Sequence, residues 1–318
     1  METFPRISII TPSFNQVSFI EQTISSVISQ NYPNLEYIII DGGSSDGSVE
    51  IIRKFENKIA FWVSEADRGQ AHAINKGLQL ATGNIIAYLN SDDYYLEGAL
   101  HRVADHFANH PEVDLIHGRC RIVDERGTKV DERVGSITRY EEIVDLWDFW
   151  WNGRNFVQPE VFWTRRIMDK VGFLREDLFW GLDYDYWVRI MRAGGVVGSV
   201  DSELACFRLH PMQKSTQPEL TANELLCTVR PYIFADSAPI GWFKRMELRG
   251  KWIFDAKFRR EADRSLRLKE ARYWRWLRLL LLSLLHPELL AAPGFRQRLL
   301  STVLNYKPTV SSLNRPKD

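Results

Sequence analysis

The sequence predicts an α/β protein with a mostly parallel sheet flanked by helices. Short β-branched runs alternate with helical patterns over the first hundred residues, and this alternation is typical of parallel strands joined by crossover helices. The connections are short, and polar residues gather where each apolar run ends. The chain has 318 residues, 45% of them apolar and 26% charged, which is enough for one large core or two domains.

Four strands and three helices are expected in the N-terminal part. Ile20, Ile24, Val27 and Ile28 recur at helical spacing, and Gly83 is a stop signal for a later helix. The predicted strands cover residues 7–12, 36–43, 61–67 and 84–90, and the predicted helices cover residues 17–30, 48–58 and 69–83.

The pattern changes from about residue 113. Residues 113–130 predict a hairpin that turns at residues 125–127. Residues 155–172 mix strand and helix signals, and residues 183–195 form an amphipathic helix closed by glycine. Residues 196–210 predict a pair of strands leading to His210.

Polar residues follow the end of each of the first four strands. Because the carboxyl ends of parallel strands meet at one edge of a sheet, ligands of such folds bind there. We therefore expect one crevice lined by four strand ends. The polar residues concerned are Thr11, Ser13 and Asn15, residues 41–48, residues 65–68, and Asp92 with Asp93.

The segment DGGSSDGS, residues 41–48, is rich in glycine, serine and aspartate. It lacks the GxGxxG spacing of dinucleotide-binding proteins, and the sequence contains no GxxxxGK[ST] motif. A nicotinamide-dependent dehydrogenase and a P-loop kinase are therefore disfavoured. The alternative interpretation of residues 44–46 is an ordinary helix N-cap.

Asp92 and Asp93 stand side by side where an apolar run ends. Two adjacent carboxylates repel each other unless water or a cation separates their charges. Hard carboxylate oxygens suit Mg²⁺ or Mn²⁺, which bind few protein groups and complete their shell with substrate phosphates. A solvated acidic turn remains the alternative.

Five segments occur in an order that resembles a known family: TPSFN, IIIDGGSSDGS, SEADRGQAHAINKG, ATGNIIAYLNSDD and GLDYDYWVRI. Together they are similar to the inverting nucleotide-sugar glycosyltransferases of family 2, which have the GT-A fold, and the resemblance covers roughly residues 6–215. It implies transfer of a sugar from a nucleoside-diphosphate-sugar to a hydroxyl acceptor. A glycan or lipid-linked acceptor in cell-surface polysaccharide or glycolipid synthesis is the expected setting.

The resemblance also implies roles for particular residues. The family's metal-binding element falls on residues 90–92, so that Asp92 becomes a ligand of Mg²⁺ or Mn²⁺ and Asp93 a helper, with His210 at the metal or the diphosphate. The nucleotide-binding residues that it implies are Thr11, Pro12, Phe14, Asp41, Arg68, Asn90 and Ser91.

The family's catalytic base aligns with Asp183, with Asp185 as its substitute. One base that takes the acceptor proton, together with a metal that neutralises the leaving diphosphate, is a sufficient set for inversion. Gln158 and Trp180 are expected on the acceptor side. The alternatives are a helix N-terminal acid favoured by the dipole for Asp183 and core packing for Trp180.

Three positions depart from the family's pattern: Gly42, Asn90 and Leu182 each stand where the family usually has an acid. They keep open a degenerate, non-catalytic member that binds carbohydrate or acts as a scaffold. A nucleotidyltransferase is disfavoured, because TPSFNQVS has no lysine or arginine to grip a triphosphate.

The charge is unevenly distributed along the chain. Residues 1–241 carry a net charge of −11 and residues 242–318 a net charge of +11. We expect a catalytic domain over residues 1–220, with a nucleotide-sugar half at about 1–110 and an acceptor half at about 111–220, followed by a basic helical extension over residues 221–318.

On a helix, residues 264–278 place five arginines opposite a face of leucine, tyrosine and tryptophan, which suits an anionic membrane surface. Residues 277–290 are apolar but too short to span a bilayer. Packing of this extension on the acidic domain is the alternative. Three cysteines at no metal or disulfide spacing fit a reducing cytosol. Together with the basic extension they predict a cytoplasmic protein at the inner face of the membrane. No recognised nucleic-acid-binding pattern is present, so no such partner is expected.

Overall fold

The computed structural model describes residues 4–259, 281 and 284–291. The strands are β1 (Ile7–Ser13), β2 (Leu35–Asp41), β3 (Phe61–Ser64), β4 (Ile85–Tyr88), β5 (Tyr94–Tyr95), β6 (Leu115–Val123), β7 (Lys129–Val134), β8 (Val161–Thr164) and β9 (Val197–Arg208). The α-helices are α1 (Ile20–Ile28), α2 (Ser48–Lys54), α3 (Gln70–Leu80), α4 (Ala99–Asn109), α5 (Tyr140–Ile143), α6 (Arg165–Val171), α7 (Leu182–Arg192), α8 (Pro218–Phe234) and α9 (Trp242–Ile253). Shorter or wider turns are η1 (Glu56–Lys58), η2 (Leu146–Arg154), η3 (Gln158–Glu160), η4 (Lys214–Thr216), η5 (Phe254–Arg259) and η6 (Pro287–Ala291).

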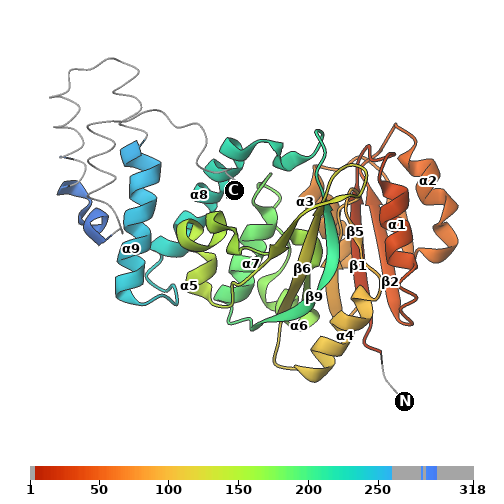
Figure 1. Cartoon of the computed structure of the whole chain (residues 1–318), viewed down its shortest axis with the longest axis horizontal. Helices are drawn as coiled ribbons and strands as arrows, with labels where there is room; N and C mark the ends of the chain where they lie inside the picture. Colours follow the sequence, from red (N-terminus) through yellow and green to blue (C-terminus); the bar gives the residue numbers. More distant parts are fainter. Residues whose placement is uncertain (1–3, 260–280, 282–283, 292–318) are drawn as a thin grey trace.

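The strands form one mixed sheet in the order β3-β2-β1-β4-β8-β6-β9-β5, with β7 paired to β6 outside this path. The first four strands are mutually parallel, and β8 runs antiparallel to both β4 and β6. This is the mostly parallel α/β fold that the sequence predicts. Helices lie on both faces of the sheet (Figure 1).

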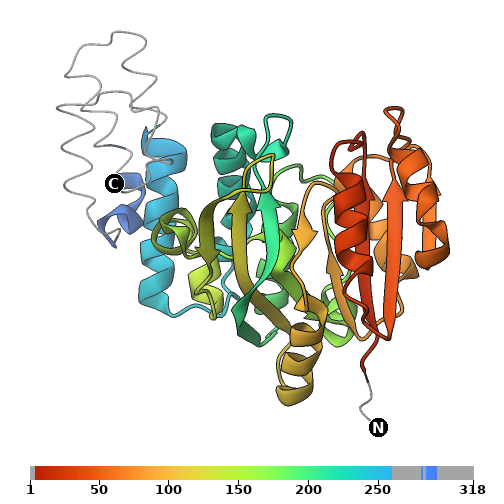
Figure 2. The same ribbon diagram turned by 45° about the vertical axis from the view of Figure 1, so that its right-hand side comes forward.

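Alternating side chains of the parallel strands fill two separate cores. Tyr37 and Ile39 of β2 point to a core closed by α1, α2 and α4, whereas Ile38 and Ile40 point to a core closed by α3, α6 and α7. Successive strand residues face opposite sides of a sheet, so a strand buried on both faces needs an unbroken apolar run. Figure 2 shows α1 lying across the first of these faces.

The second half of the sheet confirms the predicted hairpin, because β6 and β7 are antiparallel and Gly127 turns between them with a φ of 81°. Residues 155–172 contain β8 followed by α6, as expected. Residues 196–210 do not form a strand pair. They form the single long strand β9, which pairs in parallel with β6 and antiparallel with β5.

Both edges of β9 are paired, and its pairing with β6 shifts register near Gly118. A Cβ atom at Gly118 would lie 2.5 Å from Leu204 Cγ, so only glycine allows the two strands to approach this closely. The strand then continues to the short β5, which follows Asp93 directly. The end of β9 is thereby carried to the carboxyl ends of the first four strands.

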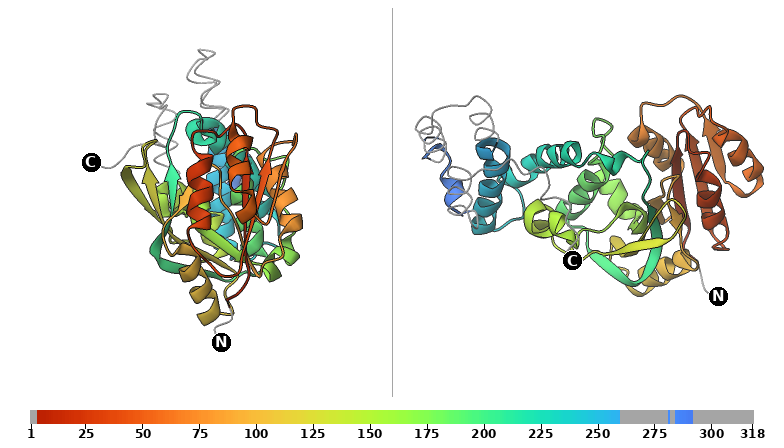
Figure 3. Two further views of the ribbon diagram at one scale, coloured as in Figure 1. Left: turned by 90° about the vertical axis from the view of Figure 1, so that its right-hand side faces the viewer. Right: turned by 45° about the horizontal axis from the view of Figure 1, so that its top comes forward.

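The helices α8 and α9 pack on the rest of the chain. Leu225 and Val229 of α8 and Leu248 of α9 belong to the same hydrophobic core as Leu182 and Trp187 of α7. The N-terminal strands and α9 lie at opposite ends of the long axis (Figure 3). The boundary at residue 220 stays a prediction, although α8 and α9 are continuous with the preceding core.

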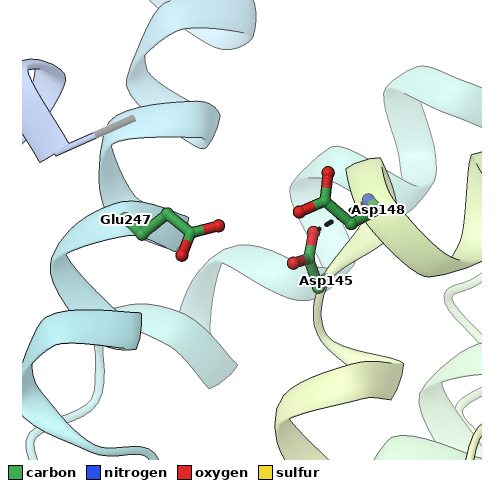
Figure 4. A group of neighbouring side chains, drawn as sticks. All are labelled: Asp145, Asp148 and Glu247. Atoms are coloured by element: carbon green, nitrogen blue, oxygen red, sulfur yellow. Dashed lines mark hydrogen bonds between the residues drawn. The ribbon is translucent and has the colours of Figure 1, made fainter. Parts of the chain in front are cut away.

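A cluster of charges around the buried Lys251 and Asp145 joins α9 to η2, and we call it the Lys251 cluster. Figure 4 shows the carboxylates of Asp145, Asp148 and Glu247 pointing towards one another from these two segments. Lys251 is only 1% exposed, and its Nζ atom lies 3.1 Å from Asp145 Oδ2, 2.6 Å from Asp148 Oδ2 and 2.6 Å from Glu247 Oε1. Lys244 adds a second ammonium, 2.7 Å from Asp145 Oδ2.

These two ammonium groups keep the Asp145 carboxylate of the cluster ionised. Burial alone would raise the pKa of Asp145, but Lys244 and Lys251 outweigh burial and hold that pKa below its usual range. The stabilising contribution of Asp145 is therefore present at neutral pH and is lost as the pH falls through its lowered pKa. The three acids are spaced closely enough to share a metal ion, but the Lys251 ammonium already occupies the position that an ion would take.

The amphipathic helix predicted over residues 264–278 lies outside the described residues. Of residues 277–290, the structure describes residue 281 and residues 284–290, where Pro287 begins η6. Among the described residues, no helix combines the length and hydropathy that crossing a bilayer requires.

The Lys251 cluster predicts a large stability effect. Lys251→Ala leaves Asp145 buried with one cation fewer, so the free energy of unfolding should fall by about 3–5 kcal/mol. Urea unfolding of Lys251→Ala, with the exposed Lys170→Ala as matched control, measures this effect. A loss below about 1 kcal/mol, no larger than that of the control, would show that the cluster does not hold α9 in place.

Candidate active site

The carboxyl ends of the parallel strands bring the predicted polar residues to one edge of the sheet. Ser13 at the end of β1 pairs in register with Asp41 at the end of β2, and Asp41 pairs with Ser64 at the end of β3. The turn with Asp92 and Asp93 begins two residues after β4. The predicted convergence of the strand ends is therefore observed.

Asp41 is completely buried and shapes the loop after β2. Its Oδ2 atom accepts hydrogen bonds from the backbone N–H of Gly43 and Ser44 and from the Ser64 hydroxyl, at 3.1, 2.8 and 2.7 Å. Its Oδ1 atom accepts one from the Ser44 hydroxyl at 2.5 Å. Both oxygens are occupied within the protein, so a direct nucleoside contact of Asp41 stays a prediction without support from this geometry.

A carboxylate that the sequence reasoning missed lies beside Gly42. A Cβ atom at residue 42 would lie 2.6 Å from Asp67 Oδ2 and 3.3 Å from Phe14 Cδ2. Gly42 thus leaves room for the Asp67 carboxylate, which is held by the backbone N–H of Gly69 at 2.7 Å. The signal was present in the sequence, since Asp67 lies three residues after the end of β3 and within one of the five motifs.

The remaining predicted nucleotide-binding residues differ in their exposure. Phe14 is 59% exposed and presents its ring near Gly42. Thr11 is buried against the Tyr37 hydroxyl at 3.1 Å, and Arg68 is exposed and forms a 2.6 Å ion pair with Glu176. Pro12 and Ser91 are buried.

The Asp92–Asp93 turn is bound to the end of β9 by Arg208, which is 3% exposed. The backbone N–H of Arg208 donates to Asp93 Oδ1 at 2.9 Å, and its Nε atom donates to the Asp92 carbonyl at 3.0 Å. The other guanidinium nitrogens donate to the Glu125 carbonyl at 2.9 Å and to Gln22 Oε1 at 2.5 Å. Arg208 therefore holds the turn in place and does not face a ligand.

Asp92 and His210 lie side by side, with Asp92 Oδ2 3.0 Å from His210 Nε2. Asp93 is buried, and no described residue donates a hydrogen bond to its Oδ2 atom. Burial raises the pKa of Asp93 well above its usual range, and the neighbouring Asp92 carboxylate raises it further.

An unpartnered buried carboxylate oxygen next to a carboxylate and an imidazole fits a divalent cation. These three residues are not among the described groups whose ligand atoms all lie within 4.8 Å of one another. An ion here would therefore draw first on Asp92 and His210.

Asp183 stands in the first turn of α7, where its Oδ1 atom accepts from the Tyr184 backbone N–H at 2.7 Å. Burial raises the pKa of Asp183 to about 6, although the charge of Lys214 opposes part of this rise. Tyr88 of β4 feels the charges of both Asp183 and Asp93. The candidate base and the candidate metal residues therefore face the same part of the sheet edge.

Asp185, expected as the substitute for Asp183, lies elsewhere. It is completely buried and accepts hydrogen bonds from Arg189 Nε at 2.8 Å and from the Tyr232 hydroxyl at 2.6 Å. Two residues along a helix differ by about 200° in direction, so Asp185 points into the core while Asp183 does not. Its role is to pair cations inside the protein.

The predicted acceptor-side residues also make contacts within the site. Gln158 is buried, and its Nε2 atom donates to the Tyr88 carbonyl at 2.5 Å while its Oε1 atom accepts from Asn90 Nδ2 at 3.1 Å. Trp180 is half-buried, and its Nε1 atom donates to the Lys214 carbonyl at 3.2 Å. Asn90 and Gln158 are therefore in direct contact, and Trp180 contacts Lys214, whose charge acts on Asp183.

Comparison with known proteins extends this picture. Residues 8–175 match the family model described as "Glycosyl transferase family 2". An uncharacterized glycosyltransferase of Nostoc sp. is 26% identical over 220 residues, which are 64% of this chain and 65% of that protein. The putative teichuronic acid biosynthesis glycosyltransferase TuaG of Bacillus subtilis is 39% identical over 101 residues, 31% of this chain and 40% of that protein. The chain thus spans less than two thirds of the length of these relatives.

Solved structures with a similar fold include a fragment of S. aureus TarS in complex with UDP. It has a TM-score of 0.60 and 17% sequence identity, and the match covers 79% of this chain and 72% of that one. The mannosyltransferase PcManGT of Pyrobaculum calidifontis, in complex with GDP-Man and Mn²⁺, has a TM-score of 0.59 and 16% identity over 95% of this chain and 86% of that one. At this level of identity the likeness concerns the fold alone.

Proposed function

The chain belongs to glycosyl transferase family 2, and from this membership we propose that it transfers a sugar from a nucleoside-diphosphate-sugar to a hydroxyl acceptor with inversion. The observation that carries the proposal is the contact between Asp92 and His210 at the carboxyl end of a parallel strand, with Asp183 and Asp93 both close enough to act on Tyr88 of that strand. Proteins of the same fold have been solved with UDP, UDP-GlcNAc or GDP-Man, which supports a nucleotide-sugar donor.

Asp183 is the general base of the proposed reaction. Its pKa of about 6 leaves the carboxylate ionised at neutral pH and able to take the proton of an attacking hydroxyl. A single displacement at the anomeric carbon, with one base on the acceptor side, inverts the configuration. Asp185 cannot replace it, because both of its oxygens are bound in the core.

Asp92 and His210, with Asp93 beside them, would hold a divalent cation such as Mg²⁺ or Mn²⁺, whose chemistry is to neutralise charge on the diphosphate. The buried orientation of Asp93 is set by Arg208. PcManGT is described in complex with GDP-Man and Mn²⁺, which supports this choice of ions.

Phe14 and Asp67 are suited to receive the nucleoside. An exposed aromatic ring can stack on a base, and a carboxylate accepts hydrogen bonds from base or ribose donors. Both side chains lie beside Gly42. Because glycine has no side chain, Phe14 and Asp67 can occupy the space that a larger residue 42 would fill.

The acceptor that we propose is a glycan or lipid-linked glycan of a cell surface, made at the cytoplasmic face of the membrane. The name of TuaG refers to teichuronic acid biosynthesis, which supports a polysaccharide role. At the start of α9, Trp242 and Phe243 are 65% and 82% exposed, and exposed aromatic residues beside a basic segment suit a membrane interface.

Donor binding should depend on the metal. With Mn²⁺ present, the matching member of a panel of UDP-, GDP- and dTDP-sugars should raise the melting temperature by about 5 °C at saturation. Because Asp92 and His210 are the proposed ligands, Asp92→Asn and His210→Ala should lose this protection, whereas the exposed Asp201→Asn should keep it. Equal protection in EDTA would contradict the metal role, and protection by none of the sugars would contradict the donor class.

Asp183 should set the acidic limb of the pH–rate profile. Since the base works only when ionised, kcat/KM for donor hydrolysis should fall about tenfold per pH unit below pH 6 and level off above it. Asp183→Asn should lose about 10²–10⁴-fold in kcat with donor protection kept, while the exposed Asp177→Asn on the preceding loop should match the wild type. Undiminished turnover in Asp183→Asn would mean that another group is the base, whereas donor protection without turnover in the wild type would indicate a non-catalytic binding protein.

Membrane association should depend on the basic C-terminal residues. The intact chain should sediment with vesicles containing anionic phosphatidylglycerol and not with neutral phosphatidylcholine vesicles, and added salt should release it. Trp242→Ser/Phe243→Ser should weaken sedimentation with the anionic vesicles. Equal sedimentation with both kinds of vesicle, or with neither, would argue against a membrane-associated acceptor.

A further inference from the structure

A chain of hydrogen bonds crosses the site from Lys214 to the backbone carbonyl of Tyr88. Lys214 Nζ donates to Gln70 Oε1 at 2.8 Å, and Gln70 Nε2 donates to Asn90 Oδ1 at 2.7 Å. Asn90 Nδ2 donates to Gln158 Oε1 at 3.1 Å, and Gln158 Nε2 donates to the Tyr88 carbonyl at 2.5 Å. The chain links η4, α3, the end of β4 and η3, four segments that are distant in sequence.

The two ends of this amide chain fix its direction. A carbonyl oxygen can only accept a hydrogen bond, and an ammonium group can only donate one. Between these ends lie the side-chain amides of Gln70, Asn90 and Gln158. Turning an amide by 180° exchanges its oxygen and nitrogen atoms, which have nearly the same shape. Turning any one of them would place two donors or two acceptors face to face. The direction that the Tyr88 carbonyl imposes leaves Gln70 Oε1 as an acceptor at the other end, and Lys214 supplies the donor for it.

Lys214 is itself held tightly. Its Nζ atom lies 4.0 Å from the centre of the Phe179 ring, and its carbonyl accepts from Trp180 Nε1 at 3.2 Å. Glu224 of α8 fixes this aromatic pair by accepting from the backbone N–H groups of Phe179 and Trp180 at 2.7 and 2.9 Å. The ammonium group therefore has a defined place between the loop after β9 and the loop before α7.

The same ammonium acts on the candidate base. Asp183 is faced by Lys214 from η4, by Glu224 from α8 and by Tyr88 from β4. Of these three groups only Lys214 carries a positive charge. Burial lowers the pKa of Lys214 to about 8, against the opposing effect of Asp183 and Glu224, so the group remains mostly protonated at neutral pH.

We propose that Lys214 is a positioning residue of the reaction: its ammonium supplies the donor that holds Gln70, and through Gln70 the amide chain of Asn90 and Gln158, and its charge acts on the Asp183 carboxylate. Because Asp183 is a base only in the transferase proposed above, this role of Lys214 rests on that function. The residues after β9 thus contribute two side chains to the site: His210, which contacts Asp92, and Lys214, whose charge acts on Asp183.

The electrostatic part is tested in the protein without ligands. Aspartate labelled with ¹³C at the side-chain carboxyl reports the ionisation of Asp183 by NMR, with Asp183→Asn assigning the signal. Lys214→Met should move the Asp183 midpoint upward by about half a pH unit or more. Lys214→Arg, which keeps the charge, and Lys170→Met, which removes an exposed lysine, should leave the midpoint within about 0.2 units of the wild type.

The positioning part is tested with UDP-GlcNAc and GDP-Man as hydrolysis probes in Mn²⁺. Lys214→Met should lower kcat on the order of tenfold with little change in KM, and its acidic limb should move to higher pH. Lys214→Arg should recover most of kcat. In Gln70→Glu the carboxylate can still pair with Lys214 but cannot donate a hydrogen bond to Asn90. This variant should therefore lower kcat. Its Asp183 midpoint should rise less than the midpoint of Lys214→Met.

An Asp183 midpoint in Lys214→Met equal to that of the wild type would overturn the electrostatic role. If Lys214→Met and Lys214→Arg lost kcat equally, and the acidic limb of each pH–rate profile stayed at the wild-type pH, Lys214 would have only a packing role. Lys214→Gln also removes the positive charge. It is measured as a second variant, in case Lys214→Met fails to fold. If the wild type hydrolyses neither probe, the proposed donors fail, but the NMR titration still decides whether Lys214 acts on Asp183.

Discussion

The arrangement of the site depends on one buried side chain, Arg208. All three nitrogens of its guanidinium donate to the Asp92 carbonyl, the Glu125 carbonyl and Gln22, while its backbone N–H holds the Asp93 carboxylate. A buried cation is stable only when its donors are matched. The strand that carries Arg208 must therefore end at the Asp92–Asp93 turn, and this requirement delivers His210 and Lys214 to the same edge of the sheet.

The acids of this protein fall into two groups with opposite environments. Asp145 and Asp185 are buried against cations, from Lys244 and Lys251 in one case and from Arg189 in the other. Asp93 is buried and Asp183 is half-buried. Neither forms an ion pair to a described cation within 4.0 Å, and desolvation raises the pKa of each. Raised carboxylate pKa values of this kind mark places where a ligand or a proton supplies the missing charge. This contrast separates the candidate active site from the Lys251 cluster.

The fold class and the family were predictable because both depend on local patterns. Alternating apolar runs located the strands β1 to β4, and five ordered motifs gave a resemblance that the family model over residues 8–175 confirms. The resemblance also implied roles for Asp92, His210 and Asp183, and these roles stay predictions. Only the tertiary structure could show that Asp185 turns into the core, since Asp183 and Asp185 differ by two positions on a helix.

Other features depend on contacts that sequence spacing does not encode. Residues 196–210 form one strand because Gly118 lets β9 approach β6 closely, and no local pattern marks that approach. The Asp67 carboxylate occupies space left by Gly42, a pairing between loops 25 positions apart. The contacts of the buried Arg208 with the Asp92–Asp93 turn likewise join residues 115 positions apart.

The account as a whole requires that a doubly charged ion bind where the turn after β4 meets the end of β9. Anomalous scattering from crystals soaked with Mn²⁺ and UDP-GlcNAc or GDP-Man locates the ion directly. We expect one strong peak within bonding distance of Asp92 Oδ2 and His210 Nε2. Manganese at another place, or no peak there while the Asp92 and Asp93 side chains face bulk solvent, would contradict the account.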